Sequence, residues 1–330
     1  MTYTTQIKNA LKELHPKSNE SSLDIYISQT ENLYQNVFNI NLNTRPSLKL
    51  GKGGMGAIER YLIQFADTTK TNYYSSVFEV MKAMKFNPVI AEKFQEKRDE
   101  FRQKYNKIND GLKSKKQEDN FVSAKLLDSF IDKYTQEIKA GSEDRDLLQI
   151  WMILKILKKF KFRNETATLE FVDKNTYDNV MKEKEKRNMI VMAPEGWFIS
   201  KNEYKTQKLY GEEIIPLKGG ILKDIEFFYE KVGKGPLFKS SFQKTKRPTT
   251  MNPNALTKYL IRWSNKNIPP KKNEDGSKKP RNLSTTMIVK AYLSASYGGA
   301  KKGMTKDAKN RGNQPETTMK VYVSSKKPKI

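Results

Sequence analysis

Apolar side chains recur at intervals of three and four through the first hundred residues, which is the spacing of one face of an α-helix. This pattern predicts four helices, over 23–38, 58–65, 74–84 and 88–107. We interpret residues 1–107 as a small helical domain.

Residues 108–120 interrupt this pattern. They hold almost no apolar side chain and a dense run of charges, so we expect an exposed linker between two domains. After the linker, Ser123 is placed to cap a further helix, and the segment 146–160 is apolar on most sides. We expect the helix over 146–160 to lie in the core of a second domain, 121–330.

Beyond residue 160 the pattern changes to short runs rich in β-branched and aromatic residues, separated by turn residues. These runs predict strands within 167–172, 188–193, 196–200 and 204–217, which we expect to form a small antiparallel sheet. Helical spacing returns in four later segments: 222–232, 254–266, 285–296 and 302–311. The chain is therefore predicted to be mainly α with a small antiparallel sheet, the second domain being of mixed α+β type.

The composition excludes several kinds of chemistry. Among the 330 residues there is no cysteine and one histidine, His15, which excludes disulfides, thiol nucleophiles, thiolate zinc sites and two-histidine metal sites. The acidic residues are scattered among lysines, as in ion-paired surface helices, and no paired-carboxylate motif occurs. We therefore expect no metal site and no cofactor.

The charge balance points to a polyanionic partner. There are 62 Lys and Arg against 37 Asp and Glu, a formal net charge of +25, and nucleic acid is the commonest partner for such an excess. Lys271, Lys272 and Arg281 lie in a basic loop that we interpret as a set of phosphate contacts, although a solvated surface loop has the same composition. We predict double-stranded DNA as the partner.

Two absences bear on the location of the protein. No apolar run is long enough to span a bilayer, and the polar N-terminus lacks the apolar stretch of a signal peptide. We expect no membrane association and a protein that is not secreted but is intracellular or packaged by something intracellular.

The glycine-rich segment 51–56 has the composition of a phosphate-binding loop. A nucleotide loop needs a preceding strand and a defined spacing, and here a helical domain surrounds the segment. We interpret it as a turn between helices.

An ordered series of residues in the second domain carries the strongest functional signal. Arg163 follows the apolar helix, Lys205 begins a predicted strand, the helix over 285–296 comes next, and Tyr322 stands nine residues after Asn313. In this order the series resembles the tyrosine recombinases. It is most similar to integrase-like members from virophages, polinton-like viruses and giant DNA viruses, through the strings RNE and YKT.

The resemblance implies a helical core-binding domain, a catalytic domain, and strand transfer through a 3′-phosphotyrosyl intermediate. It implies that Tyr322 is the nucleophile, that Arg163 is the first arginine on the phosphate, and that Lys205 is the general acid. Further DNA contacts are expected on the helix that such a domain lays along DNA and on the hairpin: Thr69, Lys70, Thr71, Tyr74 and Lys208.

The sequence departs from the family at three catalytic positions. Thr286 and Val289 stand where the second box has His or Lys and the second arginine, and Asn313 replaces the histidine of the third box. Lys290 follows Val289 on the helix and should point elsewhere, because one residue turns the side chain by about 100°. Arg281 and Arg311 are candidate substitutes from loops.

Three functions remain open at this point. The first is a DNA-binding protein with a recombinase fold and a degenerate catalytic site, which organises or packages viral or mobile-element DNA. The second is an active recombinase or integrase, and the third is a structural protein that retains only the fold. Off DNA we expect a monomeric or weakly associating protein, and self-association on DNA stays open.

Overall fold

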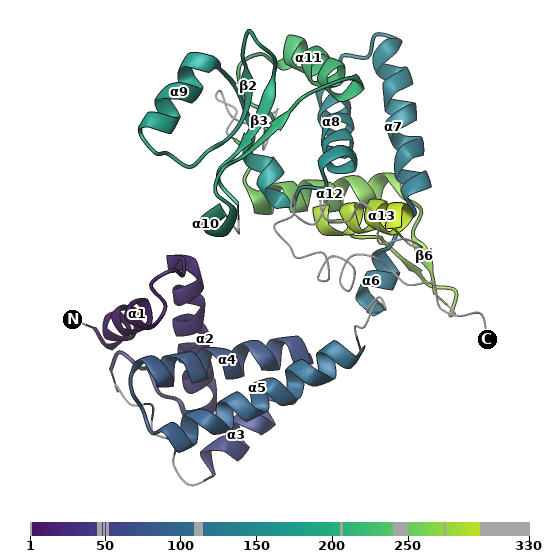
Figure 1. Cartoon of the computed structure of the whole chain (residues 1–330). Helices are drawn as coiled ribbons and strands as arrows, with labels where there is room; N and C mark the ends of the chain where they lie inside the picture. Colours follow the sequence, from purple (N-terminus) through teal and green to yellow (C-terminus); the bar gives the residue numbers. More distant parts are fainter. Residues whose placement is uncertain are drawn as a thin grey trace. The chain divides into compact units, whose positions relative to one another are not determined.

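The computed structural model describes residues 2–44, 48, 50, 53–108, 115–204, 207–239, 250–273 and 275–297. The chain divides into two compact units, Met1–Asp110 and Gly111–Ile330. Helices predominate, accompanied by a small mixed sheet and a two-stranded antiparallel hairpin (Figure 1). This confirms the predicted class, mainly α with a small sheet.

The first unit is helical, as its apolar spacing predicts. Its helices are α1 (Tyr3–Leu14), α2 (Glu20–Phe38), α3 (Gly54–Leu62), α4 (Asp67–Ala83) and α5 (Pro88–Ile108). Buried apolar side chains from all five form one core. The predicted turn over 51–56 is wrong for residues 54–56, which form the start of α3. The N-cap of this helix is Gly53, whose positive φ of 79° suits glycine.

The second half of the predicted linker is helical. Residues Lys115–Asn120 form α6, and Asp119 and Asn120 are only 6% and 7% exposed. The last two residues of this polar helix are buried because later parts of the same unit supply partners for their side chains, as described below.

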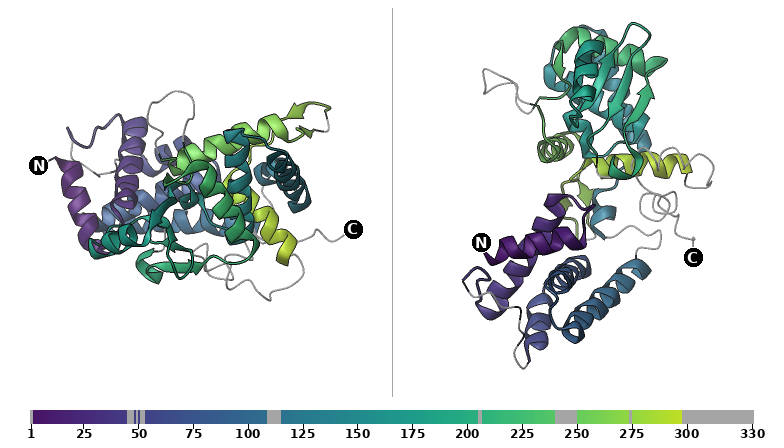
Figure 2. Two further views of the ribbon diagram at one scale, coloured as in Figure 1. Left: turned by 90° about the horizontal axis from the view of Figure 1, so that it is seen from above. Right: turned by 60° about the vertical axis from the view of Figure 1, so that its left-hand side comes forward.

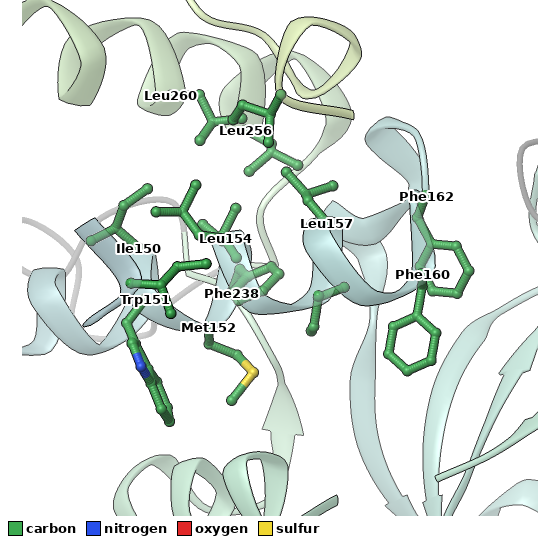
Figure 3. Close-up of a cluster of buried hydrophobic side chains, with 14 of the residues drawn as sticks. Ile150, Trp151, Met152, Leu154, Leu157, Phe160, Phe162, Phe238, Leu256 and Leu260 are labelled. Atoms are coloured by element: carbon green, nitrogen blue, oxygen red, sulfur yellow. The ribbon is translucent and has the colours of Figure 1, made fainter. Parts of the chain in front are cut away.

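The second unit is built around one buried helix, α8 (Arg145–Phe160). It follows α7 (Ala124–Lys139), which Ser123 caps by accepting a hydrogen bond from the backbone N–H of Leu126, as predicted. Leu154 and Leu157 of α8 point toward Leu256 and Leu260 of a later helix (Figure 3). Apolar side chains surround α8 on nearly all sides, and this confirms its predicted place in the core.

The main sheet has five strands in the order β4-β3-β2-β1-β5. Their bounds are β1 Glu170–Asp173, β2 Asn188–Met192, β3 Phe198–Lys201, β4 Glu213–Pro216 and β5 Gly235–Pro236. The prediction of an antiparallel sheet is wrong for one pair, because β1 and β2 run parallel. Helix α9 (Lys174–Lys182) connects them, and this crossover brings the chain back so that β2 begins at the same end of the sheet as β1.

Helices cover both faces of the sheet. Phe171, Ile190 and Ile199 lie opposite one another across three strands and belong to the core around α8 and α11 (Gly220–Val232). On the other face, Val172, Val191 and Phe198 pack with α9. Figure 1 shows α9 on one side of the sheet and α8 and α11 on the other.

The remaining elements follow the sheet. Helix α12 (Pro253–Asn267) leads into a hairpin of β6 (Lys271–Lys272) and β7 (Lys278–Lys279), and α13 (Thr285–Tyr297) follows. The left view of Figure 2 shows this hairpin beyond the end of α12. The predicted helix over 302–311 lies outside the described residues.

Candidate functional site

The segment that carries Arg163 is fixed by the end of α8. Lys161 ends the helix in the left-handed conformation, and the ring of Phe162 stacks on Phe160 with centroids 5.2 Å apart. Arg163 then caps a short 3₁₀ helix, η1 (Asn164–Thr168), and its carbonyl oxygen accepts hydrogen bonds from the N–H and hydroxyl of Thr166. A buried aromatic residue therefore anchors the backbone immediately before Arg163.

The start of α13 lies beside this segment. The hydroxyl of Thr285 donates a hydrogen bond to Oδ1 of Asn164, whose Nδ2 lies 3.2 Å from Oγ1 of Thr257 on α12. The structure thus brings together two of the sequence-predicted positions, Arg163 and Thr286, through their immediate neighbours.

Helix α13 offers no guanidinium at the position matching the second arginine. Val289 is fully buried in the core around α8, whereas Thr286 is exposed. Lys290 is 4% exposed, and its Nζ lies 2.8 Å from Oε1 of Gln117 on α6, so it points away from Val289 as expected.

The guanidinium of Arg281 contacts backbone carbonyls of the chain. Its Nη1 lies 2.5 Å from the carbonyl oxygen of Phe121, and its Nε lies 3.2 Å from that of Pro269. These contacts tie the loop before α13 to the segment after α6. In this structure the guanidinium of Arg281 is therefore a donor to backbone carbonyls of its own unit.

Tyr322, Asn313, Lys205 and Arg311 lie outside the described residues. Lys208 is on the short helix α10 (Gln207–Tyr210), but its side chain is not among those described. The geometry of the nucleophile and of the general acid therefore stays a prediction.

Asn188 joins the segment that precedes Lys205 to the segment that follows Arg163. It is 1% exposed, and its Nδ2 donates to Oγ1 of Thr168 at 2.9 Å and to the carbonyl of Glu203 at 2.8 Å. Its Oδ1 accepts from the backbone N–H groups of Asn202 and Glu203 at 3.0 and 2.9 Å. One fully hydrogen-bonded amide thus connects η1 to the end of β3.

Lys201 is a buried cation that is not among the residues predicted from the sequence. It is 1% exposed, its Nζ lies 2.8 Å from Oε2 of Glu213, and it lies over the rings of Phe162 and Tyr204 at 4.8 and 4.4 Å. The period-two alternation of β3 places Lys201 on the same face as Ile199, toward the core, and this was the available signal.

The predicted DNA-contacting residues on α4 differ in accessibility. Tyr74 is 1% exposed and stacks on Phe101 with centroids 5.8 Å apart, and burial, with Glu59 and Glu100 nearby, raises its pKa to about 12. The prediction that Tyr74 contacts DNA is therefore wrong. Thr69, Lys70 and Thr71 are half-buried; the Lys70 ammonium lies 3.6 Å from a carboxylate oxygen of Asp67.

The basic hairpin is bound to α6 through one carboxylate. Lys271 and Lys279 place their Nζ atoms 2.7 and 2.9 Å from the two carboxylate oxygens of Asp119. The hydrogen bond from Lys271, followed by that from Lys279, lowers the pKa of Asp119 to about 2. Lys271, predicted to contact phosphate, thus already has an anionic partner in this chain, whereas Lys272 is exposed.

We expect the Asp119→Asn variant to lose stability in a pH-dependent way. The pKa of Asp119 is lower in the folded chain than its unfolded value of about 3.9, so its stabilisation is present above about pH 4 and is lost as the pH falls toward 2. Urea unfolding at several pH values should show wild type more stable than the variant at pH 6, with the gap closing near pH 2. A gap that is independent of pH would contradict this, and Asp132→Asn, at an exposed acid of α7, is the control.

The described part of the second unit also holds a pocket of about 630 Å³, which is separate from these residues. It is lined by the first turns of α8 and by α7 and α12, with Tyr134, Tyr259 and Trp263 among its walls. Because Arg163 follows the opposite end of α8, the pocket is not part of the candidate site.

Within the described ranges, no group of three or more acidic residues or histidines could hold a metal ion. None of the helices in that part of the chain is both long and apolar enough to cross a membrane.

No family model matches the chain, and no curated protein matches it. Among solved structures, the chain is similar to the crystal structure of XerA recombinase, with 9% sequence identity, a TM-score of 0.37, and coverage of 98% of this chain and 94% of that chain.

Proposed function

We propose that this chain is a DNA-binding protein of tyrosine-recombinase architecture whose catalytic site is degenerate, and that it organises or packages viral or mobile-element DNA. In this proposal the unit Met1–Asp110 is the core-binding domain and the unit Gly111–Ile330 is the former catalytic domain. The two units would contact phosphates of duplex DNA, which supply affinity with little base readout.

The placement of the cations near α13 is the observation that carries this proposal. Val289 is buried in the core, Lys290 contacts Gln117 on α6, and the guanidinium of Arg281 binds backbone carbonyls. A tyrosine recombinase needs two arginines to stabilise the charge that develops on the scissile phosphate. Loss of one such donor costs about 10²–10³ in rate, and loss of a bidentate cation costs at least as much.

The retained charge supports DNA binding. The net charge of +25 accompanies an incomplete set of catalytic residues. Since the proposed role needs phosphate contacts and no chemistry, this combination fits a protein selected for binding.

One observation favours an active enzyme as the second candidate. The hydrogen bond between Asn164 and Thr285 holds the Arg163 segment against the start of α13, so the scaffold of a phosphate pocket is kept. Activity would require Tyr322, Arg163 and Lys205 together with a guanidinium from the undescribed part of the chain or from a second protomer.

Two assays on the purified chain test the proposal. With a nicked suicide duplex we expect no protein–DNA band that resists denaturation. A band that disappears in Tyr322→Phe would overturn degeneracy and establish the enzyme.

Binding to an intact duplex is then measured at several salt concentrations. If six to ten phosphates are contacted, affinity should fall about 10³–10⁵-fold between 50 and 200 mM salt. Weak binding that does not change with salt would overturn DNA binding and favour a purely structural protein.

A further inference from the structure

The hairpin of β6 and β7 consists of cross-strand lysine pairs. In its register Lys271 lies opposite Lys279, and Lys272 lies opposite Lys278. Like charges directly opposite each other destabilise an antiparallel pair, because their Cβ atoms are about 4.5–5.5 Å apart. The hairpin therefore needs negatively charged groups that offset the repulsion between its lysines.

On one face the compensation is visible. The carboxylate of Asp119 receives one ammonium on each oxygen, at 2.7 Å from Lys271 and 2.9 Å from Lys279. The Asp119 side chain is 8% exposed, so it lies beneath the two lysines. A cross-strand lysine pair on this hairpin thus holds one oxyanion by both of its oxygens.

A second cross-strand lysine pair, Lys272 and Lys278, lies on the other face of the hairpin, away from the Asp119 carboxylate. Successive residues of a strand point to opposite faces, so Lys272 and Lys278 face away from Asp119. Both are exposed, and within the described ranges neither has an acidic residue at ion-pair distance.

The turn that joins the strands fixes their spacing. The backbone N–H of Asn273 donates to the carbonyl of Ser277 at 2.9 Å, and its Nδ2 lies 2.8 Å from Oγ of Ser277. The carboxylate of Asp275 accepts from the N–H and the hydroxyl of Ser277 at 2.9 and 2.6 Å. Gly276 has a φ of 78°, the other described residues of the turn are joined by these hydrogen bonds, and the carboxylate of Asp275 is used inside it.

We propose that Lys272 and Lys278 together bind one phosphodiester group of nucleic acid, in the way that Lys271 and Lys279 bind Asp119. A phosphodiester matches the site because it carries one negative charge on two non-bridging oxygens, one for each ammonium. Binding it would also relieve the repulsion between the two lysines. This site rests on the proposed DNA-binding function, and it predicts a shared phosphate where the sequence suggested separate contacts.

The test is a double-mutant cycle on DNA affinity with Lys272→Gln, Lys278→Gln and the double variant. Loss of one phosphate contact reduces the steepness of the plot of log K against log salt by about 0.9. If the variant and the wild type bind equally at 1 M salt, the variant then binds about tenfold more weakly than the wild type at 0.1 M salt. We expect each single variant to show most of this loss, and the double variant little more. The matched control is Lys125→Gln with Lys139→Gln, two exposed lysines of α7, which removes the same charge.

Two results would overturn the shared site while leaving DNA binding intact. The double variant could bind as tightly as the control, or the two losses could multiply with a slope change of about 1.8, which would indicate two separate phosphates. Folding is checked by thermal unfolding, where removal of the repulsion should leave the midpoint unchanged or raised.

Two further measurements complete the test. Glu274, between β6 and β7, lies outside the described residues, so the Glu274→Gln variant is also measured. Unchanged DNA affinity is expected. A tenfold gain in affinity would indicate that Glu274 is the anionic partner of Lys272 and Lys278 and would overturn the proposed phosphate site.

If wild type binds no DNA, the proposed function fails, and the site is judged with inorganic phosphate by NMR of the lysine ammonium groups. Signals of Lys272 and Lys278 should then shift with one titration curve, and no shift, or a shift of one alone, would overturn the site.

Discussion

Replacing Val289 by arginine is expected to destabilise the second unit severely and to restore no phosphate contact. Val289 is fully buried in the core around α8, together with Ile288 and Leu293 of the same helix. An arginine there would either bury an unpaired guanidinium or push the helix away from the core. Urea unfolding should show a loss of about 4 kcal/mol or more, the range typical of buried unpaired charges.

The matched control is Thr286→Arg, three residues earlier on the same helix. Thr286 is exposed, so the added guanidinium stays in water and stability should change by about 0.5 kcal/mol or less. A Val289→Arg variant as stable as wild type would show that position 289 can reach solvent. Covalent DNA joining by the Val289→Arg, Asn313→His double variant would show further that the position can be made catalytic.

Removing the carboxylate of Glu213 is expected to cost about 3–5 kcal/mol of unfolding free energy, the usual penalty for leaving one member of a buried ion pair behind. Lys201 is 1% exposed, and its ammonium lies 2.8 Å from Oε2 of Glu213. In Glu213→Leu the ammonium loses this partner, and the Lys201 side chain is only 1% exposed to water. Chemical denaturation of the whole chain, followed by tryptophan fluorescence, measures the change.

Two variants make that result interpretable. The double variant Lys201→Met, Glu213→Leu should recover most of the loss, because an apolar pair of similar volume replaces both charges. Glu137→Gln breaks an exposed pair with Lys133 on α7 and should cost about 0.5 kcal/mol or less. If Glu213→Leu is as mild as Glu137→Gln, the buried pair contributes no more than a surface pair.

Helices with strong apolar spacing could be predicted from the sequence, whereas strand direction could not. The cap at Ser123 and the all-round apolar character of α8 gave correct predictions. The alternation of β1 and β2 reports which side chains face the core, and this is the same for parallel and antiparallel pairs. The direction is set by α9, a short polar helix in a segment that looks like a turn between strands.

Candidate DNA contacts were harder to predict, because composition does not report partners. Tyr74 has helical spacing with Val77 and Met81, so the pattern that predicted the helix also placed Tyr74 on its core face. Lys271 could not be distinguished from Lys272 by charge alone. The difference is a single carboxylate, Asp119, which is 152 residues away in the chain.

The contacts of α6 have a consequence for the order in which the chain folds. Asp119 finds its partners at Lys271 and Lys279, Asn120 binds the backbone of Asn282, and Gln117 binds Lys290. During synthesis, the polar groups of α6 therefore find their last partner only after about 170 further residues have been added, since Gln117 and Lys290 are 173 residues apart. The first unit closes its core within residues 7–94, so it is free to fold while the second unit is still being made. Long-range closure of this kind slows folding, so we expect the second unit to be the slower of the two to reach its native state.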